Sequence, residues 1–188
     1  MPANLDAAFS QKSSDLTAWD GEGFADGNGW ISPAIKNAFR VTSREHYNGK
    51  QSLLYHVEGA PSTSGGWNWA NWQMGGAIDL AGFDKLIFYV KLTGTKPTQV
   101  QTSLACGPNK VTSENVDLAK YTPDYADGQW HLVSIPLKDL YGASKFDPKA
   151  AYELRFSTTE AKDSTFDLYV DAVRFVKTPE RTNGDVSH

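Results

Sequence analysis

The stretch LIFYVKL at residues 86–92 decides the fold, because it is apolar almost throughout. Such a length suits a β-strand better than a helix, and the run is rich in β-branched and aromatic residues. A strand that is apolar at consecutive positions needs cover on both faces. We therefore predict that residues 86–92 form a strand near the centre of a sheet.

Strand patterns continue on both sides of this stretch. Asn48-Gly49 separates two of them and has the residue types of a tight hairpin turn. We predict the other strands at residues 39–42, 52–57, 67–74, 99–104, 130–137, 152–157 and 166–175, with shorter extended pieces at 5–9 and 15–20.

The segments between these strands are rich in turn residues. Residues 25–29 and 62–66 are predicted loops, because Gly, Ser, Asp and Asn dominate them. Helical turns are expected only at residues 137–141 and 149–152. About eight to ten short strands separated by turns are typical of a sandwich. The predicted fold class is all-β: a galactose-binding-like β-sandwich jelly roll with two antiparallel sheets.

Length and composition limit the classes of function. The 188 residues suffice for one full-sized domain, which we place at residues 1–177, followed by a polar tail at 178–188. A net charge of −4 without any Lys/Arg block argues against nucleic acid as a partner. No apolar run is long enough to span a bilayer. Cys106 is the one cysteine, so no internal disulfide forms, and we interpret it as a structural thiol.

Three phrases carry a family resemblance: IDLAGFDKLIFYVK at 78–91, GQWHLVSIPL at 128–137 and FDLYVDAVRF at 166–175. In this order the chain resembles, over residues 39–176, the jelly-roll carbohydrate-binding modules appended to bacterial polysaccharide-degrading enzymes. The β-glucan-binding families eleven and thirty are the most similar.

The resemblance implies a non-catalytic module. It would bind one chain of a β-glucan or a related hemicellulose in a shallow cleft on the concave sheet. It also implies a monomer within a larger, secreted protein that degrades plant cell walls. Residues 1–4 are not followed by the basic and apolar regions of a signal peptide.

Tryptophans are the first candidates for sugar contacts, because a pyranose ring has apolar faces that an indole covers. Trp67, Trp69 and Trp72 lie within six positions of one another. In a regular strand Trp67 and Trp69 share one face and Trp72 points the other way. We expect at least one of the three to be a sugar platform and at least one other to lie in the core. Trp130 is assigned to the core.

Polar side chains that alternate along two strands are the second group. Gln99 and Gln101 share one face of their strand, and Glu153 and Arg155 share one face of theirs. If both strands line the same cleft, these groups would bind sugar hydroxyls. The alternative is a solvated sheet face with a cross-strand ion pair. Further candidates are Tyr121 or Tyr125, and His131.

Structural calcium is implied by the family resemblance, because many members carry one away from the cleft. The matching positions are Asp20 or Glu22, the carbonyl of Lys50, and Asp171. Asp171 interrupts an apolar strand, and its carboxylate is a ligand type that calcium takes. The alternative is an aspartate at a strand bulge that binds backbone.

Two other classes of function are compatible with a sandwich of this composition: an enzyme, either a glycoside hydrolase or a polysaccharide lyase, and a protein-interaction module. A glycoside hydrolase needs two carboxylates facing each other across a cleft, and Glu153 has no evident partner in the sequence. A polysaccharide lyase would use a set such as His131, Arg155 and Tyr89. A protein-interaction sandwich would gather its aromatic residues into one apolar patch.

Overall fold

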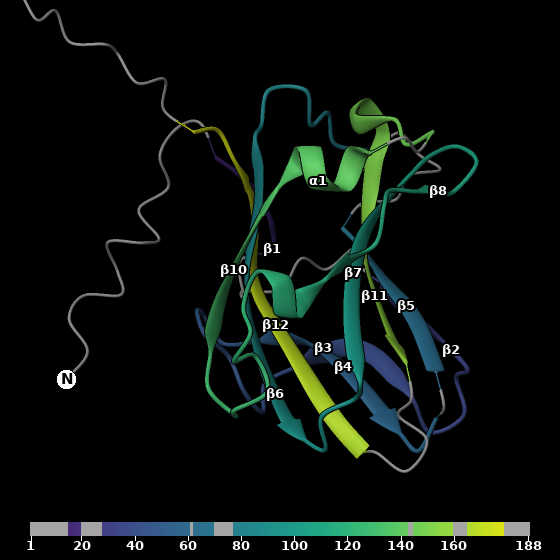
Figure 1. The fold of residues 1–188 in the computed structure, drawn as a ribbon, viewed down its shortest axis with the longest axis vertical. Coiled ribbons are helices and arrows are strands. Elements are labelled where there is room, and N and C mark those ends of the chain that lie inside the picture. The colour runs from purple at the N-terminus through teal and green to yellow at the C-terminus, as the bar shows by residue number, and fades with distance from the viewer. Residues whose placement is uncertain are drawn as a thin grey trace, which may run out of the picture.

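The chain folds into two six-stranded antiparallel sheets packed face to face (Figure 1). The computed structural model describes residues 15–19, 28–60, 62–69, 77–142, 145–159 and 165–178. The first sheet has the strand order β10-β6-β12-β4-β3, and β1 also pairs with β12. Its strands are β1 (Leu16–Trp19), β3 (Ala38–Thr42), β4 (Ser52–Glu58), β6 (Lys85–Gly94), β10 (His131–Pro136) and β12 (Thr165–Val176).

The second sheet has the strand order β2-β5-β11-β7-β8, and β9 also pairs with β7. Its strands are β2 (Asn28–Ser32), β5 (Ser62–Asn68), β7 (Gln99–Cys106), β8 (Val111–Thr112), β9 (Val116–Asp117) and β11 (Ala151–Thr159). The helical elements are short: η3 (Leu118–Lys120), α1 (Leu137–Tyr141) and η4 (Pro148–Ala150). None of these described helices has the length and apolar character to cross a membrane.

The predicted fold class is confirmed, and so is the position of the LIFYVKL stretch. It lies in β6, which pairs with β10 on one side and β12 on the other. The predicted helical turn at 137–141 is α1. The turn expected at 149–152 lies earlier, as η4, and β11 follows it directly.

Two segments that were predicted as loops contribute to strands. Residues 62–66 belong to β5, and β2 begins at Asn28. Glycine has a low strand propensity, but here a long-range contact requires it. A Cβ added to Gly65 would lie 2.6 Å from the carbonyl oxygen of Trp30. The close pairing of β2 with β5 therefore explains a glycine-rich strand that local sequence does not predict.

Aromatic rings fill the space between the sheets. Trp67 contacts Trp19 edge-on with centroids 5.9 Å apart, and Phe39 lies 5.8 Å from Trp67. Tyr55 and Phe156 extend this cluster, and all five side chains are buried. Burial of such large apolar surfaces is the main stabilising contribution to the fold.

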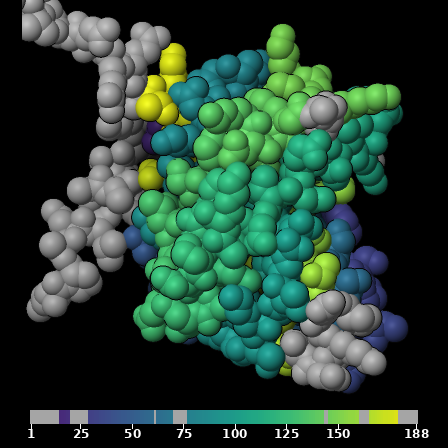
Figure 2. Space-filling view, viewed as in Figure 1, coloured from purple at the N-terminus to yellow at the C-terminus, as the bar shows by residue number. Residues whose placement is uncertain are grey.

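One open side of the sandwich is closed by the segment between β9 and β10, which carries η3. It crosses in front of the two sheets in Figure 1, and Figure 2 shows this side as a continuous green and teal surface. Leu118 and Tyr125 anchor the segment, because both side chains are buried in the core. The backbone N–H of Leu92 also donates to the carbonyl of Tyr125.

The loop between β3 and β4 covers the outer face of the first sheet. The ring of Tyr47 in this loop stacks on Tyr89 of β6 with centroids 3.7 Å apart. The carboxylate of Asp171 in β12 accepts hydrogen bonds from the backbone N–H groups of Tyr47 and Asn48. Leu54, on the outer side of β4 between Arg40 and Tyr169, is also buried.

Candidate functional site

The outer face of the second sheet is lined by polar and small side chains. We call it the polar face. Strand pairing places Trp30, Gly66, Arg155 and Ser103 in one row across β2, β5, β11 and β7. Alternate residues along each strand share a face. The polar face therefore contains Trp30, Ser32, Ser62, Ser64, Gly66, Asn68, Gln99, Gln101, Ser103, Glu153, Arg155, Ser157 and Thr159.

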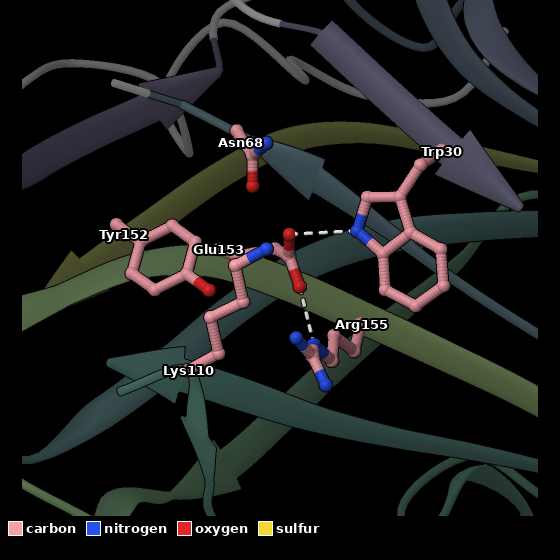
Figure 3. A pocket seen from close by; sticks show the side chains of 6 residues that line it. All are labelled: Trp30, Asn68, Lys110, Tyr152, Glu153 and Arg155. Atoms are coloured by element: carbon pink, nitrogen blue, oxygen red, sulfur yellow. Dashed lines mark hydrogen bonds and ion pairs between the residues drawn. The ribbon is translucent and has the colours of Figure 1, made fainter. Parts of the chain in front are cut away.

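One end of the polar face is hollowed (Figure 3). The hollow has a volume of about 310 Å³ and is open to solvent. Its lining comes from β2, β5, β11 and the turn before β8. These residues are Trp30, Asn68, Lys110, Tyr152, Glu153 and Arg155.

Trp30 is the exposed aromatic side chain of the hollow. Its relative exposure is 36%, whereas Tyr152 is buried at 1%. The guanidinium carbon of Arg155 lies over the Trp30 ring, 5.2 Å from its centroid. A partly exposed indole next to a guanidinium offers an apolar surface together with hydrogen-bond donors.

Glu153 lies in the centre of the hollow with its carboxylate buried. Oε2 accepts a hydrogen bond from the indole N–H of Trp30 at 2.8 Å. Oε1 accepts a hydrogen bond from Nε of Arg155, which forms an ion pair with it. Gly66 leaves room for this group, because a Cβ there would lie 2.5 Å from Oε1.

Four of the sequence-predicted residues lie together on the polar face. Glu153 and Arg155 line the hollow, and Gln99 and Gln101 lie on β7 of the same sheet. Gln101 pairs with Ser157, two residues beyond Arg155. Gln99 donates from Nε2 to a carboxylate oxygen of Asp117 at 3.0 Å. The alternative prediction included an ion pair on this face; the structure has one, but along β11 and not between strands.

Two of the three clustered tryptophans, Trp67 and Trp69, are directed toward the core. Trp67 is only 4% exposed, and its ring packs between the sheets. Trp69 is half-buried, with its ring 5.7 Å from Phe175. The two do share a side, as alternation predicts, but it is the inner side. Trp67 is thus a core residue and offers no ring face to a ligand; Trp72 lies outside the described residues.

Tyr125 and His131 lie away from the polar face. Tyr125 is 1% exposed, and burial raises the pKa of its hydroxyl to about 12. His131 belongs to β10 of the first sheet, where Nε2 lies 2.7 Å from Oδ1 of Asp127. The sequence does not show which sheet a segment joins, because that depends on pairing with strands far away in the chain. The predicted place of these two residues near the cleft therefore differs from the structure.

Sequence reasoning missed the aromatic residue of the site, Trp30, and also Asn68, Lys110 and Tyr152 of the hollow. The segment of Trp30 reads as a loop because Gly27, Asn28 and Gly29 precede it. The available signal was the spacing of Trp30 and Ser32 about Ile31, which is a strand alternation. Only the pairing of Trp30 with Gly66 reveals that the indole lies on the polar face.

The residues expected to hold calcium are described in part. Asp171 is fully buried, and its Oδ2 accepts from the N–H groups of Tyr47 at 2.7 Å and Asn48 at 2.9 Å. Burial raises the pKa of its carboxyl, and these N–H groups oppose the rise. Its Oδ1 accepts from the N–H of Ala172, and the pairing of β12 with β6 has a bulge that begins at Asp171. These contacts match the alternative expectation of an aspartate at a strand bulge that binds backbone. Asp20 and Glu22 lie outside the described residues.

The sequence model for the Carbohydrate binding domain 30 family matches residues 7–177. The chain belongs to this family. The resemblance inferred from the sequence is thereby confirmed, and the chain is a carbohydrate-binding module. A comparison with curated proteins gives no match.

Solved structures support the same fold. A family 30 module of a cellulosomal cellulase from Clostridium thermocellum is 16% identical, with a TM-score of 0.68 over 88% of this chain and 99% of that one. A family 11 module from Clostridium thermocellum, in complex with a β-1,3-1,4-mixed-linked tetrasaccharide, is 11% identical, with a TM-score of 0.64 over 91% and 100%. A β-1,2-glucanase from Parabacteroides distasonis is 15% identical, with a TM-score of 0.67 over 89% of this chain and 26% of that one.

The different positions of Trp67 and Trp30 predict different costs of truncation. Trp67→Ala should lower the free energy of unfolding by about 3–5 kcal/mol, because it leaves a cavity between the sheets. Trp30→Ala should cost less, about 1–2 kcal/mol, because its ring is partly exposed and water can reach the Glu153 oxygen that loses the indole N–H. Urea unfolding of both variants measures this difference. Equal losses of stability would contradict the assignment of Trp67 to the core and Trp30 to the surface.

Proposed function

We propose that this module binds one chain of a β-glucan or a related hemicellulose on the polar face without cleaving it. The observation that carries the proposal is the exposed indole of Trp30 beside Arg155 in an open, polar hollow. The apolar face of a pyranose would lie on the Trp30 ring. The guanidinium of Arg155 and the amides of Asn68 and Gln101 would bind hydroxyls. An open surface leaves much of the ligand hydrated, so we expect dissociation constants of about 1 μM to 1 mM.

Structural relatives support this ligand class and its context. The family 11 neighbour is a complex with a β-1,3-1,4-mixed-linked tetrasaccharide, and the family 30 neighbour comes from a cellulosomal cellulase. By analogy, we propose that this module is part of a larger, secreted glycan-degrading enzyme and acts as a monomer. Its role would be to hold that enzyme on a plant cell-wall polysaccharide.

The lining of the hollow favours binding over hydrolysis. A glycosidase uses two carboxyl groups about 5–10 Å apart, one of which donates a proton. Among the described lining residues Glu153 is the one carboxylate, and both its oxygens already accept hydrogen bonds. The polar lining also differs from the contiguous apolar patch of a protein-interaction site.

Trp30→Ala should weaken retardation in affinity electrophoresis with mixed-linkage β-glucan by about tenfold or more, the effect expected for a central aromatic contact. Trp130→Ala is the matched control. Trp130 was assigned to the core from the sequence, but it is half-buried and packs against Tyr47 and Tyr169 on the outer side of the first sheet. Its removal should therefore leave the retardation unchanged. Similar melting temperatures would show that both variants are folded. A Trp30→Ala variant that is retarded like the wild type would contradict the proposed face.

We also propose that a structural calcium ion binds near Asp171, with the Lys50 carbonyl and Asp20 or Glu22 as further ligands. The buried carboxylate of Asp171 supports this proposal, since calcium prefers carboxylate and carbonyl oxygens. The ion would share that carboxylate with the backbone N–H groups of Tyr47, Asn48 and Ala172. The described residues contain no group of three or more acidic, His or Cys side chains arranged for a metal. The ion would therefore depend on backbone carbonyls and on residues beyond those described. It would stabilise the fold and leave the polar face unaffected.

Chelation with EDTA should lower the melting temperature of the wild type by several degrees, because loss of a bound ion removes its stabilisation. Asp171→Asn should abolish this sensitivity, whereas Lys50→Ala should retain it, because its carbonyl and not its ammonium is the proposed ligand. Differential scanning calorimetry measures all three proteins. A wild-type melting curve that EDTA does not move would exclude the calcium proposal.

A further inference from the structure

Glu153 is unusual on the polar face because its carboxylate is buried. Its relative exposure is 2%, whereas Trp30 in the same hollow is 36% exposed. A buried charge is costly unless it is paired and hydrogen-bonded. The partners of Glu153 therefore decide what this residue does.

Both partners of Glu153 face the hollow. Oε2 accepts from the indole N–H of Trp30 at 2.8 Å, and Oε1 accepts from Nε of Arg155. In Figure 3 the carboxylate lies between these two side chains, and the dashed lines join it to each. One acidic group thus contacts the exposed aromatic ring and the cation beside it.

Gly66 makes this arrangement geometrically feasible. Trp30 is on the edge strand β2 and Glu153 is on β11, with β5 between them. Gly66 pairs with both Trp30 and Arg155, and a Cβ on it would lie 2.4 Å from the carboxyl carbon of Glu153. The Glu153 side chain therefore occupies the space above Gly66 and reaches across β5.

We propose that Glu153 is a positioning residue that fixes the orientation of Trp30 and Arg155 for the ligand. Its hydrogen bond holds the indole edge, and its ion pair holds the guanidinium over the ring. A ring and a cation that are already oriented lose less conformational entropy when a ligand binds. The indole N–H is also occupied, so Trp30 presents a ring face and not a donor. This inference rests on the proposed function of the polar face.

A double-mutant cycle of Glu153→Gln and Trp30→Phe tests the proposal by calorimetric titration with a mixed-linkage β-1,3-1,4-glucan tetrasaccharide. Glu153→Gln should weaken binding by about fivefold when Trp30 is present, a coupling typical of side chains in direct contact. In the Trp30→Phe background the same change should cost less than about twofold, because no indole N–H remains to be held. The matched control is Glu58→Gln, on the first sheet, which should bind like the wild type.

A spectroscopic readout separates this inference from the proposed function. Without ligand, Glu153→Gln should change the near-UV circular dichroism and the tryptophan emission, because the Trp30 indole loses its fixed partner. If the wild type binds no glucan but Glu153→Gln still shows this spectral change, the proposed function is refuted and the positioning role is supported. Wild-type binding with unaltered spectra and affinity in Glu153→Gln would overturn the positioning role.

Gly66→Ala keeps the inference testable if Glu153→Gln does not fold. The added methyl group would displace the carboxylate while leaving Glu153, Trp30 and Arg155 chemically intact. It should give the same spectral change as Glu153→Gln. A folded Gly66→Ala variant with wild-type spectra and affinity would contradict the proposal.

Discussion

Side-chain alternation in the paired strands β5 and β11 divides the residues of this region between the core and the polar face. Trp67, Leu154 and Phe156 point inward and belong to the hydrophobic core. Their neighbours lie on the polar face, where Glu153 lines the hollow and its carboxylate lies over Gly66. A slip of one residue in this pairing would exchange the two sets. Burial of the core residues therefore fixes the register of β5 against β11, and this register brings the residues of the site together.

The two outer faces of the sandwich have different roles for the same reason. On the first sheet, Asp171 binds the backbone of the β3–β4 loop, and Tyr47 from that loop stacks on Tyr89, so part of the face is covered. On the second sheet, small residues and amides leave the face open, with Trp30 at the edge strand. A surface of this kind can accept a long polymer, which needs an unobstructed path more than an enclosed pocket.

Local patterns in the sequence predict much of this structure. The two-sheet fold, β6 and the shared face of Glu153 and Arg155 all follow from periodicity within single strands. The roles of Trp30 and Trp67 do not, because periodicity shows which residues share a face but not which face is inside. That choice depends on pairing between segments far apart in the chain, such as β2 with β5 and β5 with β11. Glycines permit these close pairings, and the same glycines make the strands look like loops when only the local sequence is considered.

The most direct test of this account is a titration of the ¹⁵N-labelled module with a soluble mixed-linkage β-glucan oligosaccharide, followed by heteronuclear NMR. The largest chemical-shift changes should occur at the indole N–H of Trp30 and at backbone amides of β2, β5, β7 and β11. Shifts confined to the first sheet, around β10 and β12, would contradict this account, because the ligand would then lie on the opposite face of the sandwich.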